Sequence, residues 1–169
     1  MIALALVGAG CEKHDYVHEG ETEGIYVDVG NLVYQVQMSR FLNPADREDR
    51  EYLQGMPQLS SEEIWFGVWM RVKNYSDDTL PVTDEIFIMD TEEDRFDPTE
   101  LSRTNVFAYR PIQLGAGQVY PLPDTAAATG PIQGSLILFR LTNDSLQNRP
   151  LTLHIEQGDA EPAEISLDL

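Results

Sequence analysis

Hydrophobic and polar residues alternate along most of this chain with a period of two rather than 3.6, which is typical of half-buried β-strands. The longest run has apolar side chains at every second position: Ile64, Phe66, Val68, Met70 and Val72. The positions between them are Trp65, Gly67, Trp69, Arg71 and Lys73. An earlier run places Leu32, Tyr34, Val36 and Met38 on one face. Both runs predict strands with one face in a core.

Shorter stretches of the same kind follow, separated by turns rich in Gly, Pro, Asn and Asp. These strand candidates are Ile25–Val29, Glu85–Met89, Val106–Tyr109, Gln118–Tyr120, Ser135–Leu141, Leu151–Glu156 and Glu164–Leu167. Many short strands without strand–helix alternation indicate an all-β, antiparallel sandwich or barrel.

One segment departs from this pattern. Asn43 is a good N-cap residue, Pro44 suits the first helical position, and Gly55 suits the end of a helix. We therefore predict a helix of about three turns over residues 44–54, supported by opposite charges four residues apart.

The composition is ordinary for a globular protein, but the charge balance is not. Its 169 residues suffice for one domain with a core, and 11 Lys and Arg against 29 Asp and Glu give a net charge of −18. So negative a surface repels phosphate backbones and anionic headgroups. We expect no nucleic-acid partner and no cofactor.

The N-terminus suggests export. Residues 1–10 are apolar or small, too few to span a bilayer, and end at Cys11, the single cysteine. Ala9 and Gly10 before Cys11 resemble a bacterial lipobox, which predicts lipid on Cys11 and a place on the outer face of the cell membrane. The alternatives are a cleaved signal peptide with an inert cysteine, and a first strand that buries Cys11.

These signals predict three parts. Residues 1–11 are the signal peptide and lipobox remnant, residues 12–24 an acidic stalk, and residues 25–169 the β-sandwich. His14 and His18, four residues apart in the stalk, could bind a transition metal if it were helical, but Gly20 and Gly24 favour a solvated tether.

The sequence offers no support for catalysis. A catalytic nucleophile needs a base within hydrogen-bond reach, and the third histidine, His154, is out of phase with its apolar neighbours and predicted to face solvent. No G-x-S-x-G motif occurs. We expect a protein that is not an enzyme.

The acidic loop 90–97 raises the question of a calcium site, because Ca²⁺ prefers carboxylate and carbonyl oxygens. Its candidate ligands are Asp90, Glu92, Asp94 and Asp97, with help from Asp77, Asp78 or Asp84. An EF-hand is excluded, since Arg95 occupies the position that needs glycine. The alternative is a solvated hairpin turn.

Trp65 and Trp69 lie on one face of the long strand, with Tyr75 beyond them. If exposed, they would form a stacking surface for sugars or an extended peptide. The alternative is that the segment carrying Tyr52 and Leu53 covers this face.

Several motifs resemble a known family. Val72-Lys73-Asn74-Tyr75-Ser76 looks like the V-x-N-x-S signature of the Telokin-like immunoprotective extracellular domains. Asp90–Phe96 is similar to that family's D-x-x-G-x-x-Y hairpin without its glycine, and Leu114–Gln118 to its L-x-P-G-x turn before an apolar strand, here Ser135–Phe139.

This resemblance covers residues 25–169, and residues 130–135 and 148–151 are similar to an uncharacterised actinobacterial subgroup. It implies an immunoglobulin-like β-sandwich on secreted or lipid-anchored bacterial proteins, and it implies no catalytic residue.

Two functional hypotheses follow. The first is a lipid-anchored, non-enzymatic interaction module that contacts an envelope protein or glycan through its loops or its tryptophan face. The second is an acidic extracellular protein that binds Ca²⁺ or has a structural role in the envelope.

Overall fold

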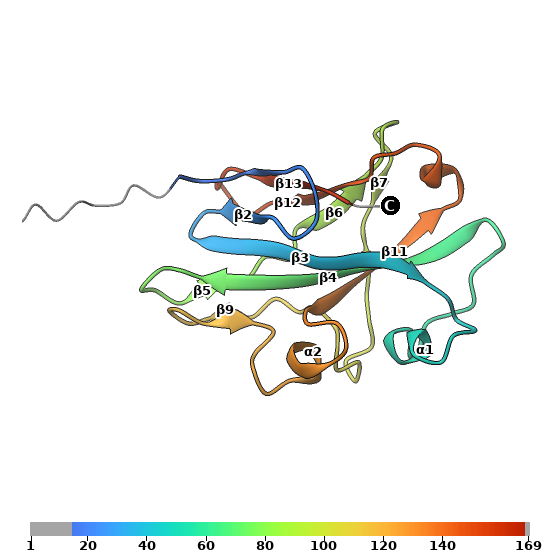
Figure 1. Ribbon diagram of the computed structural model, residues 1–169, viewed down its shortest axis with the longest axis horizontal. Helices are drawn as coiled ribbons and strands as arrows, with labels where there is room; N and C mark the ends of the chain where they lie inside the picture. Colours follow the sequence, from blue (N-terminus) through green and yellow to red (C-terminus); the bar gives the residue numbers. More distant parts are fainter. Residues whose placement is uncertain (1–14, 168–169) are drawn as a thin grey trace, which may run out of the picture.

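The chain forms an antiparallel β-sandwich of immunoglobulin-like type, which confirms the predicted fold class (Figure 1). The computed structural model describes residues 15–167. The first sheet contains, in spatial order, β2 (Tyr26–Val29), β3 (Leu32–Leu42), β4 (Glu63–Asn74), β11 (Ser135–Thr142) and β8 (Pro98–Thr99), with β10 (Val119–Tyr120) also paired to β4. The second contains β1 (Glu19–Gly20), β13 (Ala163–Ser166), β12 (Thr152–Ile155), β6 (Ile86–Met89) and β7 (Arg95–Phe96).

Smaller elements complete the fold. β5 (Leu80–Pro81) pairs with β9 (Gln113–Leu114), and three single turns of helix are α1 (Asp49–Tyr52), α2 (Ala126–Thr129) and a 3₁₀ turn at Asp144–Leu146. Within residues 15–167, no helix has the length and apolar character needed to cross a bilayer.

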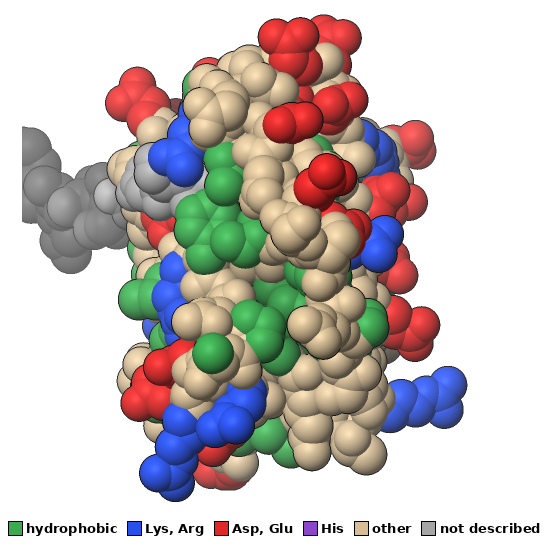
Figure 2. All heavy atoms as spheres, turned by 90° about the vertical axis from the view of Figure 1, so that its right-hand side faces the viewer, with side chains coloured by type: hydrophobic (Ala, Val, Ile, Leu, Met, Phe, Trp, Pro, Cys, Tyr) green, Lys and Arg blue, Asp and Glu red, His purple; other side chains and the backbone are tan. Residues whose placement is uncertain are grey.

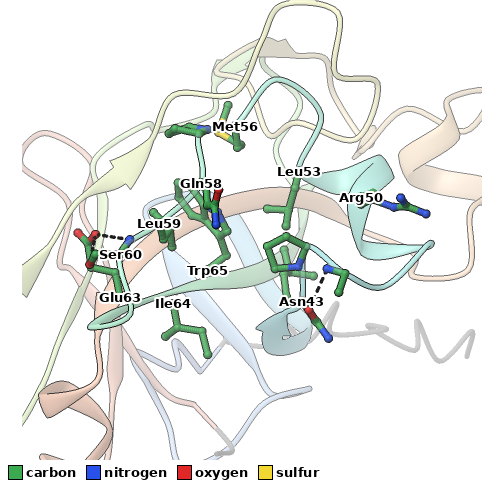
Figure 3. Close-up of a pocket in the computed structure, with 14 residues that line it drawn as sticks. Asn43, Arg50, Leu53, Met56, Gln58, Leu59, Ser60, Glu63, Ile64 and Trp65 are labelled. Carbon is green, nitrogen blue, oxygen red and sulfur yellow. Dashed lines mark hydrogen bonds between the residues drawn. The ribbon is translucent and has the colours of Figure 1, made fainter.

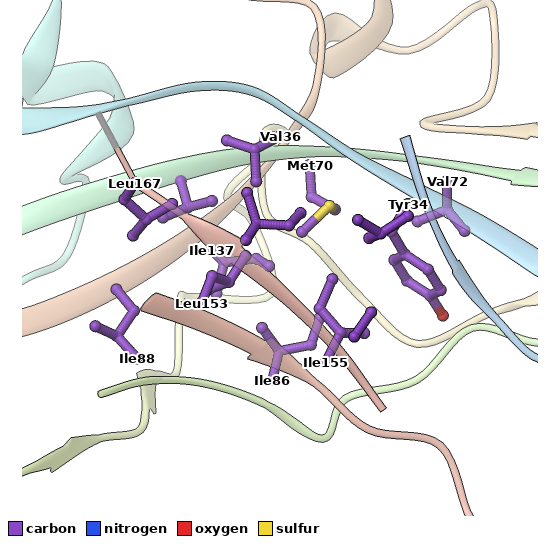
Figure 4. Close-up of a cluster of buried hydrophobic side chains, with 14 of the residues drawn as sticks. Tyr34, Val36, Met70, Val72, Ile86, Ile88, Ile137, Leu153, Ile155 and Leu167 are labelled. Carbon is purple, nitrogen blue, oxygen red and sulfur yellow. The ribbon is translucent and has the colours of Figure 1, made fainter. Parts of the chain in front are cut away.

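The main core fills the space between the two sheets (Figure 4). Phe66, Val68, Met70 and Val72 of β4 are buried there, as the alternation predicts. They face apolar residues of the second sheet, among them Ile86, Ile88, Leu153, Ile155 and Ile165. Burial of alternate positions on both sheets explains the period of two in the sequence.

A β-bulge in β3 corrects one predicted orientation. The register of β3 against β4 shifts between Val36 and Met38, so that Val36 pairs with Met70 but Met38 pairs with Trp69. An extra residue in one strand turns the following side chains to the other face. Met38 therefore lies on the outer face and is exposed, whereas the sequence pattern placed it in the core.

One predicted strand and the predicted course of the stalk also differ from the structure. Residues 106–109 form no strand but a loop, in which Ala108 makes an isolated bridge to Leu136 of β11. The predicted stalk does not project freely: from Val17 to Gly24 it lies against the sandwich, because β1 pairs with β13 and the Gly24 N–H donates to the carbonyl of Val36. Residues 12–14 lie outside the described residues.

The predicted helix 44–54 is reduced to one turn, α1. The side-chain oxygen of Asn43 accepts the N–H of Ala45, and that of Asp46 accepts the N–H groups of Glu48 and Asp49. These short side-chain-to-backbone bonds hold residues 43–48 in successive turns, which compete with helix formation.

Asn74, the central residue of the 72–76 motif, joins two turns of the chain. Its side chain is fully buried (0% exposed), and its amide nitrogen donates to the carbonyls of Asp78 and Leu114 at 2.7 and 2.8 Å. Its amide oxygen accepts the N–H and hydroxyl of Ser76. The motifs at 72–76 and 114–118 are therefore parts of one hydrogen-bonded junction.

A buried tyrosine ties the loops to the core. The Tyr34 hydroxyl accepts the N–H of Thr83, whose carbonyl accepts the hydroxyl of Tyr109. Burial raises the pKa of Tyr34 to about 12, so its hydroxyl stays neutral at physiological pH.

The Asn74 junction yields a prediction about stability. Asn74→Ala leaves the buried Leu114 carbonyl without its side-chain donor and also removes the bond to the Asp78 carbonyl. Each buried polar group left unsatisfied costs about 1–3 kcal/mol. We expect a loss of about 2–4 kcal/mol in the free energy of unfolding, measured by urea denaturation. Asn143→Ala is the control, because exposed Asn143 makes one side-chain bond, to the Ser61 carbonyl. Equal losses in the two variants would contradict this role of Asn74.

Candidate ligand-binding surfaces

The tryptophan pair on β4 is buried, which corrects the hypothesis of an exposed stacking surface. Trp65 is 2% and Trp69 0% exposed. Both belong to a second core on the outer face of the first sheet, together with Leu42, Tyr52, Leu53, Leu101, Ala108, Leu136 and Leu138. The segment carrying Tyr52 and Leu53 covers this face, and the Tyr52 ring meets Trp69 edge-on with ring centroids 5.1 Å apart.

Trp69 fits into a notch made by two glycines. A Cβ on Gly67 would lie 2.9 Å from the Trp69 ring, and one on Gly134 would lie 3.0 Å from the Trp69 backbone. The Arg40 guanidinium lies 5.4 Å from the ring centroid. The Trp69 indole N–H has no hydrogen-bond partner within the described residues, so the ring is held by packing.

Tyr75, the third predicted surface residue, is 60% exposed, but it is separate from the two tryptophans. It follows the far end of β4, where the Lys73 ammonium lies 4.0 Å from its ring centroid. The structure therefore divides the predicted surface into a buried tryptophan part and an open tyrosine part.

The cover over Trp65 creates a groove that the sequence pattern did not reveal (Figure 3). The groove has a volume of about 680 Å³ and lies between residues 43–45 and residues 56–60. Leu42, Leu53 and Trp65, all buried, lie at its base. Its remaining apolar lining comes from Pro44, Ala45, Met56, Pro57, Leu59 and Ile64.

Two charged contacts fix the loop that forms this groove. The Asp49 carboxylate accepts from Arg40 Nη2 at 2.5 Å and from the Asn43 N–H at 2.7 Å. At the other wall, Glu63 accepts from both the hydroxyl and the N–H of Ser60. These hydrogen bonds lower the pKa of Glu63, so both carboxylates are ionised at neutral pH.

The groove also offers backbone hydrogen-bonding groups. Within residues 15–167, the N–H groups of Gln58 and Leu59 donate no hydrogen bond. Arg50 and Glu63 lie on opposite sides of the groove (Figure 3). The surface thus combines apolar contacts, free backbone donors and charges of both signs, which suits an extended peptide.

The end of the sandwich that carries α1 shows where such a ligand would approach. Hydrophobic side chains gather in the middle of this face, and acidic and basic side chains both lie around its rim (Figure 2). The signal available in the sequence was the pair Met56 and Leu59, two apolar residues within a loop.

The acidic loop does not gather its carboxylates. The Asp90 side chain is buried and accepts the N–H groups of Glu92 and Asp94 and the amide of Asn148. Asp97 pairs with Arg95 at 2.8 Å. Among residues 15–167 no three His, Cys, Asp or Glu side chains are placed to hold a metal ion. The geometry is that of a hairpin turn closed by Asp90.

The described histidines have no nucleophile beside them. His18 contacts the carbonyl of Asp28 and the carboxylate of Glu161. His154 stacks on Phe87 with centroids 4.9 Å apart and lies 3.4 Å from Glu164. Cys11 and His14 lie outside the described residues.

Comparison with known proteins identifies the fold. The structure is similar to that of the yjhA protein from Bacillus subtilis, with a TM-score of 0.51 and 8% identity, over 88% of this chain and 99% of that one. A functionally unknown protein from Listeria monocytogenes EGD-e matches with a TM-score of 0.52 and 11% identity, over 88% of this chain and 85% of that one. An uncharacterised β-sandwich protein from Clostridium difficile 630 gives 0.51 and 10%, over 92% and 97%.

The chain has the β-sandwich fold of these proteins. At such low identity the likeness shows the fold and nothing more. No protein-family model matches the chain, and no protein with curated annotation does. The resemblance to Telokin-like domains is therefore supported at the level of fold, while membership of that family or of an actinobacterial subgroup is not supported.

The Asp49 contact yields a prediction with a defined pH dependence. Burial opposes ionisation of Asp49, but bonds from Arg40 and the Asn43 N–H outweigh it and lower the pKa of this carboxyl. A lowered pKa in the folded state stabilises the protein above the unfolded value of about 4, and this contribution is lost as pH falls further. Asp49→Asn should cost about 1.5–3 kcal/mol at pH 7, and the difference from wild type should shrink toward pH 3.

Urea denaturation at both pH values measures this effect. Asp97→Asn is the control, because Asp97 is 67% exposed and its pair with Arg95 is expected to contribute less than about 1 kcal/mol. A difference between Asp49→Asn and wild type that stays constant from pH 7 to pH 3 would contradict the role of the ionised carboxylate.

Proposed function

We propose that this protein is a non-enzymatic interaction module, anchored to the outer face of the cell membrane by lipid on Cys11, that binds an extended segment of an envelope protein. The observation that carries the binding part is the apolar groove of about 680 Å³ between residues 43–45 and 56–60. The sequence of residues 1–11 supports the anchor.

The build of the groove supports binding without large rearrangement. Its base is part of the second core, and its loop is fixed by the bonds of Asp49 and Glu63. A rigid scaffold that presents a loop-built groove is a common arrangement for recognition. Because the surface is already formed, a ligand would lose less free energy to ordering the protein.

The position of the groove supports display toward a partner. The described chain begins at one end of the sandwich, whereas α1 and the groove lie at the opposite end (Figure 1). A tether at Cys11 would therefore leave the groove facing away from the membrane.

The proposal is non-enzymatic because the contacts of His18 and His154 within residues 15–167 include no hydroxyl or thiol that could act as a nucleophile. The second hypothesis, Ca²⁺ binding at loop 90–97, has no comparable support. Asp90 already accepts hydrogen bonds from its own loop, and Asp97 pairs with Arg95.

The anchor is tested by expressing the full gene, with its own upstream codons, in a bacterial host. We expect the wild-type protein in the membrane fraction with the intact mass of a diacylglycerol-modified Cys11. Cys11→Ser should move it to the soluble fraction, since the acyl chains supply the membrane affinity. Wild-type protein that is soluble and retains residues 1–10 would contradict the anchor.

The groove is tested by photo-crosslinking in the source cells. A photoreactive residue at Met56 should give one main adduct, identified by mass spectrometry. Leu59→Asp places a charge in the apolar lining and should reduce this adduct at least tenfold. Leu122→Asp, at an exposed side chain in the turn before α2, should leave it unchanged. An adduct equally strong in both variants, with both melting like wild type, would contradict binding in the groove.

A further inference from the structure

The outer face of the first sheet carries a second open surface, at the end where β4 leaves the tryptophan core. Register places Tyr26, Gln35 and Arg71 side by side across β2, β3 and β4. In the next row Val33, Lys73 and Val119 lie side by side across β3, β4 and β10. Directly paired residues point to the same face of a sheet, so these side chains form one platform.

The platform lies in a furrow made of three adjoining hollows. The first, of about 500 Å³, shares Val33 and Tyr75 with the second, of about 170 Å³. The second shares Arg71 and Val119 with the third, of about 310 Å³, which ends at Pro121 and Pro123. A hollow that continues in one direction across the strands suits a linear polymer better than a compact ligand.

Aromatic rings and cations line this furrow together. Tyr26 is 53% and Tyr75 60% exposed, so both rings offer surface for stacking. Tyr75 is steadied by the Lys73 ammonium 4.0 Å from its centroid. The Gln35 amide is fixed by its bond to the Gly24 carbonyl at 2.7 Å.

The charges of the furrow are opposite in sign to the rest of the protein. Arg71 and Lys73 form no ion pair with any residue in the described range 15–167. The one carboxylate that lines the three hollows, Asp28, is 5% exposed and accepts the N–H of Val17. In a chain of net charge −18, two neighbouring cations without an acidic partner indicate an anionic group on the ligand.

We propose that this furrow binds an acidic polysaccharide. Tyr26 and Tyr75 stack against its sugar rings, the Arg71 guanidinium receives a carboxylate or phosphate in its planar fork, and Lys73 supplies a second positive charge. This site is separate from the groove at residues 43–65 and does not depend on the function proposed for it.

Other polyanions fit the furrow less well. A duplex nucleic acid or an anionic bilayer presents a broad field of negative charge to the whole acidic surface and is repelled. A single glycan chain follows the furrow, and the surrounding charge is screened over about 8 Å at physiological salt.

Titration calorimetry of the full-length protein with oligogalacturonate tests the proposal, with a phosphomannan oligosaccharide as the phosphate-bearing probe. We expect binding to one of the two, at least tenfold tighter than to a neutral dextran of the same length, and weaker as salt rises from 50 to 200 mM. Arg71→Gln/Lys73→Gln should reduce affinity at least tenfold, and Tyr26→Ala about fivefold.

The matched control is Arg103→Gln/Arg149→Gln, which changes the net charge equally at two exposed arginines outside the furrow and should bind like wild type. Equal losses in the two double variants would overturn the proposal, because net charge alone would explain them. So would equal binding of dextran, no binding of either acidic glycan by folded protein, or binding of anionic phosphatidylglycerol vesicles in place of glycans.

Discussion

The need to bury β4 on both of its faces governs this structure. One face of β4 lies between the sheets, as in any sandwich. The other face carries Trp65 and Trp69, whose large apolar rings are unfavourable in water. Trp69 is accommodated because Gly67 and Gly134 leave room for its indole. The fold therefore needs a third layer over the first half of β4, and residues 42–62 and 100–108 provide it.

This third layer accounts for both candidate surfaces. Where the covering loop returns toward β4, it leaves a groove over Trp65, and where the cover ends, Arg71 and Lys73 lie open beside Tyr26. The change occurs within one strand, between Trp69 and Arg71. A single alternating segment thus carries buried aromatic residues at one end, and an exposed Arg71 and a half-buried Lys73 at the other.

Sequence reasoning succeeded where one local rule decided the outcome. The strands over residues 32–42 and 63–74 follow from alternating burial, and the loop closed by Asp90 follows from turn chemistry. It failed where distant segments decide. Cover of Trp69 by the segment carrying Tyr52 was one of two alternatives, and the structure confirms it, but alternation could not choose between them. Nor could alternation show that one extra residue in β3 turns Met38 outward.

The candidate surfaces were still harder to predict. The groove arises between two loop segments, and the furrow depends on which residues become neighbours across β2, β3, β4 and β10. The types of residue were visible in the sequence, but their register was not. The pairing of β13 with residues 19–20 was missed for the same reason, because parallel pairing between segments far apart in the sequence leaves no local pattern.

That terminal pairing has a mechanical consequence. β1 is held by a two-residue parallel ladder, whereas β13, β12 and β6 behind it have four residues each and contribute side chains to the main core. If tension acts on the N-terminus, residues 17–24 peel away first, releasing about 27 Å of chain at roughly 3.4 Å per residue. The segment would then lengthen the tether under tension while the sandwich and both of its surfaces stay folded.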